Sequence, residues 1–226
     1  MKEVLEKILS YLPVYIPDLV RIISGPKRFV AGHIKRKGEL VKAFTFFGVS
    51  LSIFFLLQAD ITVRGRGFTT DFIVHGILYL LSVAIFTVVL RLSWRIVGGR
   101  ADYQGFLIAT LYYVGVLFVG IAIAALCFTG VLRMFYPNVY TWFIQYLAAP
   151  NLPNPNNLDP TIARGILVAF LGFLTVAVLT LGWGLAGWGA YREMNKLSRP
   201  RSCAALFLTM LIFLPVSAGL FIAGWH

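Results

Sequence analysis

The side chains that could carry acid–base or metal chemistry are few: nine Asp and Glu, three His and two Cys among 226 residues. Every Asp and Glu lies outside the interior of the long apolar stretches, and His33, His75 and His226 lie in three separate regions of the chain. Ion-coupled transport and intramembrane proteolysis need ionisable groups deep in the membrane. The sequence therefore predicts a protein that is not an enzyme, with no catalytic residue, no metal and no cofactor.

One segment, Gly182 to Gly187, formally matches the glycine pattern of dinucleotide-binding loops. That pattern works between a strand and a helix and needs an acidic residue about 20 positions later, whereas this segment lies inside a hydrophobic stretch. We interpret it as helix packing, because small residues four apart let two membrane helices approach closely. The same spacing occurs in three pairs: Gly120 with Ala124, Gly165 with Ala169, and Gly182 with Ala186.

The apolar stretches around these residues predict a membrane protein. Hydrophobic residues make up 59% of the chain and charged residues only 13%, against about 25% charged in soluble domains. Five stretches are long enough to cross a bilayer: about 43–58, 72–94, 106–131, 166–190 and 204–225. The predicted fold is all-α and polytopic, with a cytoplasmic segment 1–40 ahead of a five-helix transmembrane domain 41–226.

The basic residues predict the orientation. If the five stretches are spans, sixteen of the twenty Lys and Arg fall before the first span or in the second and fourth loops. Since cytoplasmic loops carry the excess of Lys and Arg, we expect the N-terminus inside and the C-terminus outside. The net charge of +11 is then an orientation signal, and no nucleic-acid partner is expected.

The first forty residues are expected to lie on the cytoplasmic face. Residues 2–12 and 17–24 have the apolar spacing of two short amphipathic helices, and residues 27–37 interleave basic with apolar side chains, which suits an anionic leaflet. Docking a protein partner is the alternative. The residues expected to contact lipid or partner are Lys27, Arg28, Lys35, Arg36, Lys37, Arg100, Arg192 and Arg201.

The long outer loop, residues 132–163, has two halves. The first is aromatic and almost uncharged, as in a helix at the membrane interface, where Trp and Tyr are enriched. The second is rich in Pro and Asn, which is typical of a linker. The loop could be a tether, a lid over a cavity or a docking site.

Three short segments resemble the bacterial members of the Yip (Ypt/Rab-interacting protein) domain family. These are Ile22 to Phe29, the glycine-rich turn Gly98 to Phe106, and Tyr191 to Ala205. The resemblance implies five spans, a cytoplasmic N-terminus and an integral protein of the bacterial inner membrane. The chain lacks the long N-terminal extension of the eukaryotic relatives that act with small GTPases.

Two functions are compatible with these features. The first is a non-enzymatic scaffold or subunit of a membrane complex, with a membrane protein or a second copy as its partner. The alternative is a permease-like protein that binds or moves a lipid or a hydrophobic small molecule. A buried cavity between the spans, open to one leaflet and lined by Tyr112, Tyr113 and Ser50, would favour the alternative. A solid bundle would count against it.

Overall fold

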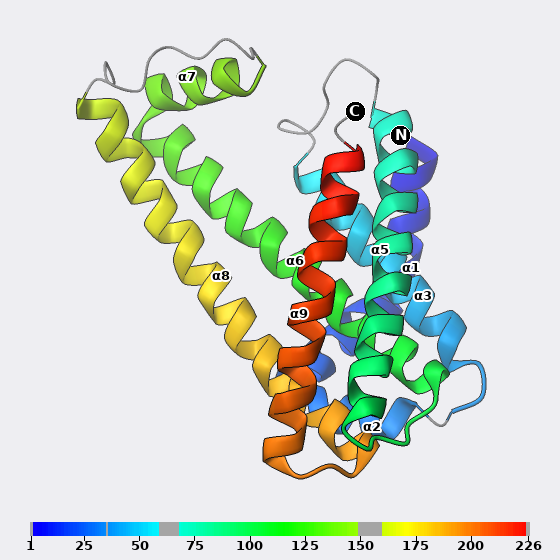
Figure 1. The fold of residues 1–226 in the computed structure, drawn as a ribbon. Coiled ribbons are helices and arrows are strands. Elements are labelled where there is room, and N and C mark those ends of the chain that lie inside the picture. The colour runs from blue at the N-terminus through cyan, green and yellow to red at the C-terminus, as the bar shows by residue number, and fades with distance from the viewer. Residues whose placement is uncertain (1, 35, 59–67, 149–159, 225–226) are drawn as a thin grey trace.

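The computed structural model describes residues 2–34, 36–58, 68–148 and 160–224, and these residues fold entirely into helices and short connections (Figure 1). The helices are α1 (Lys2–Ser24), α2 (Pro26–His33), α3 (Glu39–Leu57), α5 (Phe68–Ile96), α6 (Tyr103–Phe135), α7 (Pro137–Ala148), α8 (Pro160–Asn195) and α9 (Arg199–Gly224). The prediction of an all-α fold is confirmed for the described residues.

Four helices are long and apolar enough to cross a membrane: α3, α5 from Ile73 onward, α6 and α8. They coincide with the first four predicted spans. The fifth prediction, 204–225, falls on α9 and extends past the described residues. That span and the orientation of the chain stay predictions.

The spanning helices are longer than the uncharged stretches that predicted them. The stretch 106–131 lies within α6, and 166–190 lies within α8. The difference arises because charged residues end the apolar part of a helix without ending its backbone hydrogen bonds. Helix ends are set by backbone signals instead: α7 and α8 each begin at a proline, whose missing N–H costs nothing in a first turn.

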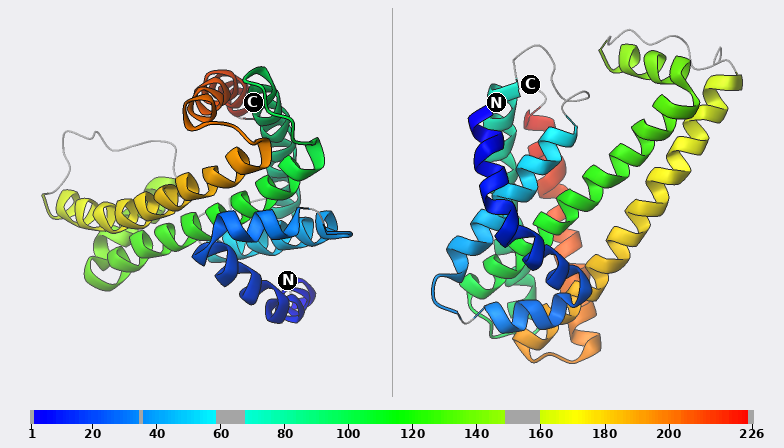
Figure 2. Two further views of the ribbon diagram at one scale, coloured as in Figure 1. Left: turned by 90° about the horizontal axis from the view of Figure 1, so that it is seen from below. Right: turned by 180° about the vertical axis from the view of Figure 1, so that it is seen from behind.

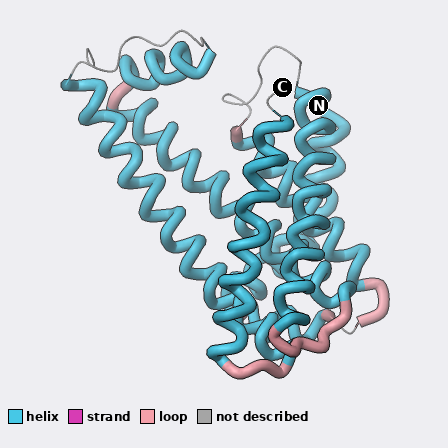
Figure 3. Tube along the Cα trace, in the orientation of Figure 1, coloured by secondary structure: helices cyan, strands magenta, loops and turns pink. Residues whose placement is uncertain are grey.

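The helices converge at one end and separate at the other (Figures 1 and 2). We call the converging end the base: it contains α2 and the connections 97–102 and 196–198 (Figure 3). Away from the base, α6 and α8 run together, diverging from α5 and α9, and α7 crosses their far ends. We call α6 from Gly120 onward, α8 up to Leu181, and α7 the arm.

The N-terminal region differs from its prediction. Residues 2–24 form one helix that contains Pro13 and Pro17, and α1 runs along the side of the bundle next to α3 rather than across the base (Figure 2). The reason is that Tyr15 and Ile22 are buried in the main core, with Leu19 packed against it. The basic segment that follows is partly helical, as α2.

The core is unevenly distributed. The main cluster fills the base and its neighbourhood with large aromatic side chains, among them Trp94, Phe106 and Tyr112, each at most 1% exposed. In the arm, the second cluster has only three buried members, Leu132, Val139 and Ala169. The base therefore positions side chains far more tightly than the arm does.

Candidate functional site

The predicted basic residues lie on segments that meet at the base (Figure 3). Arg28, Arg36, Lys37, Arg100 and Arg201 are exposed there. The remaining ones differ: Lys27 and Arg192 are half-buried, and Lys35 lies outside the described residues.

One of these cations is already used within the molecule. The Lys27 ammonium on α2 forms an ion pair with the Glu193 carboxylate near the end of α8. Lys27 therefore joins α2 to α8, whereas the exposed arginines are available to phosphate groups or an acidic partner.

The six small residues predicted to pack helices divide into two groups. A Cβ on Gly120 would lie 2.4 Å from the Thr180 side chain, so α6 and α8 meet closely there, and a Cβ on Gly165 would lie 3.0 Å from Tyr136. Ala124 and Ala169 are fully buried.

Gly182 and Ala186 make no such contact. They lie on the outward face of α8, and no atom comes within 4 Å of the place of a Gly182 Cβ. The packing face of α8 carries Gly187 instead, whose Cβ would lie 3.1 Å from the Tyr113 ring.

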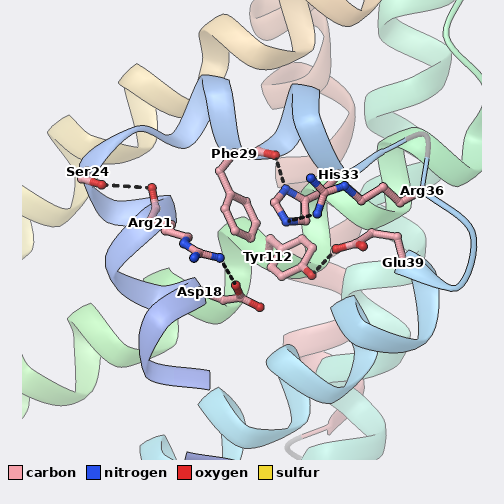
Figure 4. Close-up of polar contacts among 8 residues, drawn as sticks. All are labelled: Asp18, Arg21, Ser24, Phe29, His33, Arg36, Glu39 and Tyr112. Atoms are coloured by element: carbon pink, nitrogen blue, oxygen red, sulfur yellow. Dashed lines mark hydrogen bonds and ion pairs between the residues drawn. The ribbon is translucent and has the colours of Figure 1, made fainter. Parts of the chain in front are cut away.

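The buried carboxylate of Glu39 lies at the start of α3 (Figure 4). Glu39 is 1% exposed, and the Tyr112 hydroxyl of α6 donates a 2.6 Å hydrogen bond to its Oε1. Its second oxygen, Oε2, is buried and has no hydrogen-bond partner among the described residues. Glu39 is the first residue of α3, and the packing of α3 on α6 encloses this first turn.

Aromatic and basic side chains of α2 surround this pair (Figure 4). The His33 ring stacks on Phe29 at 4.0 Å, and Phe29 meets Tyr112 edge-on at 4.9 Å. His33 Nδ1 lies 2.6 Å from the Phe29 carbonyl oxygen, and Arg36 Nη1 lies 3.4 Å from Nε2. A donor on Nδ1 and an acceptor at Nε2 fit these partners. The cluster joins α3 to α6 by a hydrogen bond and α2 to α6 by aromatic contacts.

Other buried hydroxyl and amide groups tie distant segments together. Tyr15 of α1 lies 2.9 Å from Ser50 of α3, and Tyr113 of α6 donates to the Pro26 carbonyl at 3.2 Å. Asn195, at the end of α8, accepts from the Ala101 amide at 3.1 Å. Burial raises the pKa of Tyr15 to about 12, while its contact with Ser50 lowers it by a smaller amount. No spacing signal in the sequence identifies these pairs, since each joins residues far apart in the chain.

A cavity of about 320 Å³ lies between α5, α6, α8 and α9. Its walls are apolar and aromatic, including Phe86, Leu117, Trp183 and Phe213, with Thr110, Tyr113, Tyr191 and Thr209 as hydroxyl-bearing members. The alternative function named Tyr112, Tyr113 and Ser50 as a cavity lining. Of those three, only Tyr113 faces this cavity.

The hydroxyls that line the cavity are engaged by the protein. Thr110 lies 3.0 Å from the Tyr191 hydroxyl, and Thr209 donates to the Ala205 carbonyl at 2.7 Å. The Trp183 indole donates to the Ile23 carbonyl at 3.1 Å. The lining hydroxyl groups therefore need no hydrogen bond from a ligand. The buried Trp188 indole N–H, which has no partner among the described residues, could donate one.

Among the described residues, no group of three His, Cys, Asp or Glu could hold a metal ion. The two cysteines are free in the described chain, Cys127 half-buried and Cys203 exposed.

Comparison of the chain with family models, with curated proteins and with solved structures finds no match.

Proposed function

We propose that the protein is a non-enzymatic integral membrane protein that binds the hydrocarbon part of a lipid or of a hydrophobic small molecule. The observation that carries this proposal is the cavity of about 320 Å³ between α5, α6, α8 and α9. Its volume is at the lower end of the range of about 300–1,000 Å³ for small-molecule sites.

The depth of the cavity supports a hydrocarbon ligand. Its α6 residues, Thr110 to Leu117, follow the start of that helix by 7 to 14 positions. At 1.5 Å per residue they lie about 10–21 Å from the base. In a bilayer with a hydrocarbon core about 30 Å thick, that depth corresponds to the acyl chains of the leaflet next to the base.

The charge distribution supports a cytoplasmic base. The described members of the basic set lie at this end, and sixteen of twenty Lys and Arg are assigned to it by the alternation of loops. We propose five spans, with the base on the cytoplasmic side, and location in a bacterial inner membrane with an anionic cytoplasmic leaflet. The expected cytoplasmic N-terminus then applies only to the end of α1 and to α2, because α1 begins at the opposite end of the bundle (Figure 2). Labelling of Cys203 by an impermeant maleimide in inverted but not in right-side-out vesicles tests the orientation.

Filling the cavity tests the ligand. Gly184 lines it, and a Cβ added there would lie 3.9 Å from the Leu117 side chain, so Gly184→Leu should occlude the cavity. Protein in membranes is illuminated with a phospholipid that carries a photoreactive group on its acyl chain. We expect labelled cavity peptides from α6 and α8 in the wild type and about tenfold less label in Gly184→Leu.

The matched control is Gly182→Leu, two residues away on the outward face of α8, where the new side chain meets nothing. It should label like the wild type. Equal labelling of the cavity peptides in Gly184→Leu and in the wild type would overturn the proposal.

A second candidate is a Yip-like scaffold or subunit of a membrane complex. The exposed basic side chains at the base, among them Arg28, Arg36 and Arg100, support this candidate, since an acidic partner surface would complement them. Reversing the charges of Arg36 and Lys37 and comparing co-purified proteins after mild solubilisation tests it. Identical partner sets would count against this candidate and would leave the cavity proposal standing.

A further inference from the structure

A second hollow lies outside the four-helix cavity, between the N-terminal helix and the first span. It has a volume of about 260 Å³ and is lined by residues of α1 and α3, including Tyr11, Val14, Asp18, Lys42 and Val49. We call it the α1–α3 groove. From it we propose a separate lipid site that takes a phospholipid whose headgroup carries both a phosphate and an ammonium group.

The groove is polar at one end and apolar along the rest. The two helices run in opposite directions, α3 starting at the base and α1 ending there (Figure 2). Asp18 follows Tyr11 by seven residues, and Lys42 precedes Val49 by seven, which is about 10 Å along each helix. Both charged residues therefore lie at the end nearer the base, as the headgroup of a lipid in the adjacent leaflet would.

The two charged side chains are complementary to a zwitterionic headgroup. Lys42 is exposed and forms no ion pair with a described residue, so its ammonium is free to bind a phosphate. Asp18 lies 3.7 Å from the Arg21 guanidinium (Figure 4), which is too long for a hydrogen bond. Its carboxylate can accept a hydrogen bond from an ammonium group.

The same pair disfavours other lipids. An anionic headgroup without an ammonium group would bring its phosphate close to the Asp18 carboxylate, whose ion pair with Arg21 is long, at 3.7 Å, and offsets its charge only in part. A lipid with a hydroxyl headgroup, such as diacylglycerol, would leave the Lys42 ammonium without an anionic partner. Specificity then comes from repulsion and unpaired charge as well as from attraction.

The apolar part of the groove has open walls. Val14 is 67% exposed, and Tyr15 and Phe46, which also line the groove, stack at 4.8 Å. An acyl chain laid along the groove away from Lys42 would cover Val14 and rest on these rings. The groove thus combines a headgroup end and a chain end in the order that a bilayer phospholipid presents them.

The test compares three lipids on the full-length protein in detergent. Dioleoyl-phosphatidylethanolamine, dioleoyl-phosphatidylglycerol and dioleoylglycerol are added at equal concentration, and bound lipid is counted by native mass spectrometry. We expect the ethanolamine lipid to be retained at least tenfold more than either of the others. Equal retention of the ethanolamine and glycerol phospholipids would overturn the proposal.

Two variants assign this preference to the groove. Asp18→Asn keeps the shape of the side chain and removes its charge, and it should reduce the preference for the ethanolamine lipid at least fivefold. Lys42→Met should lower the retention of both phospholipids. Lys196→Met, a change at an exposed lysine between α8 and α9 and outside the groove, should change neither. An unchanged preference in Asp18→Asn would overturn the proposal.

The proposals for this groove and for the four-helix cavity can be tested independently of each other. Gly184→Leu occludes the cavity and should leave the headgroup preference unchanged, while Asp18→Asn should leave the photolabelling of the cavity peptides unchanged. A headgroup preference that disappears in Gly184→Leu would assign the effect to the cavity and overturn the groove as its source.

Discussion

The base and the arm are built from the same apolar residue types, yet they are held together in different ways. At the base, aromatic rings enclose polar groups that find partners on other helices, as Tyr112 does with Glu39 and Tyr191 with Thr110. In the arm, α6 and α8 meet through small residues, with Gly120 against Thr180 and Gly165 against Tyr136. Buried hydrogen bonds position the base, and close backbone approach positions the arm.

The difference follows from what surrounds each region. Several helices converge at the base, so a polar group there can be shielded from the membrane by protein on every side. In the arm, two helices are exposed along much of their length, with Leu171, Leu179 and Leu181 more than half exposed. Polar groups between two lipid-facing helices are exposed to the hydrocarbon, which is energetically unfavourable. Van der Waals contact across a glycine carries no such penalty.

The largest effect is expected from widening the α6–α8 contact in the arm. In Gly120→Val, the new side chain would overlap the Thr180 side chain, whose Cγ2 and Oγ1 lie 2.4 and 2.6 Å from the position of the Cβ. Overpacking of this kind lowers the free energy of unfolding by about 3 kcal/mol. Unfolding of the purified protein in detergent measures the change.

Gly172→Val is the matched control, because α8 is open at that position and nothing lies within 4 Å of the Cβ. Thr180→Ala should restore part of the stability of Gly120→Val. If Gly120→Val and Gly172→Val were equally stable, the close contact could not be what holds the arm.

The next largest effect is expected at the base. Tyr112→Phe removes the hydroxyl that donates to Glu39 and leaves both carboxylate oxygens without a partner among the described residues. Losing a buried hydrogen bond to a carboxylate costs about 2 kcal/mol, seen as a lower unfolding midpoint.

Tyr79→Phe controls for the loss of an aromatic hydroxyl, since no hydrogen bond joins the Tyr79 hydroxyl to a described residue. If Tyr112→Phe were as stable as Tyr79→Phe, the hydrogen bond between Tyr112 and Glu39 would not be what stabilises the base.

The sequence was most informative where a pattern lies within one helix. Uncharged apolar stretches predicted α3, α5, α6 and α8, because a membrane helix must cover its own backbone with apolar side chains. The distribution of Lys and Arg predicted that the N-terminal basic segment and the second and fourth loops lie at one end of the bundle. In the structure, α2 and the connections 97–102 and 196–198 meet at the base.

Features that depend on contacts between two helices could not be predicted from the sequence. In the sequence, Glu39 is indistinguishable from any other charged residue that flanks a span. Only the structure shows that it pairs with Tyr112, which is 73 positions away. Small residues four apart occur on both faces of α8, and only the position of Tyr113 shows that Gly187, not Gly182, faces a neighbour. The cavity likewise requires four helices to be placed together.

A smaller effect is expected where α1 joins the bundle. Tyr15→Phe removes the contact of the hydroxyl with Ser50 at 2.9 Å, which should cost about 1 kcal/mol at neutral pH. Because burial raises the pKa of Tyr15 to about 12, the unfolded chain loses this proton near pH 10 while the folded chain keeps it. Wild-type stability should therefore fall as the pH rises from about 10 to 12.

The comparison with Tyr15→Phe isolates this residue from the other tyrosines. The stability difference between the wild type and the variant should shrink over that pH range, as measured by denaturant unfolding at each pH. Tyr11→Phe, an exposed tyrosine of the same helix, should follow the wild type. A difference independent of pH would show that Tyr15 titrates normally.

The smallest effect is expected from the surface ion pair at the base. Its loss shows how much an exposed polar contact contributes to stability compared with a buried one in the same region. The side chains of Lys27 and Glu193 are 44% and 47% exposed, so water and salt screen their attraction. Lys27→Met should lower the free energy of unfolding by about 0.5 kcal/mol or less, and the loss should disappear in 1 M salt, where screening acts within about 3 Å. Glu193→Gln should match it, and the double variant should cost no more than either single change. A loss as large as that of Tyr112→Phe would mean that charge pairing at the surface, rather than buried hydrogen bonding, positions the base.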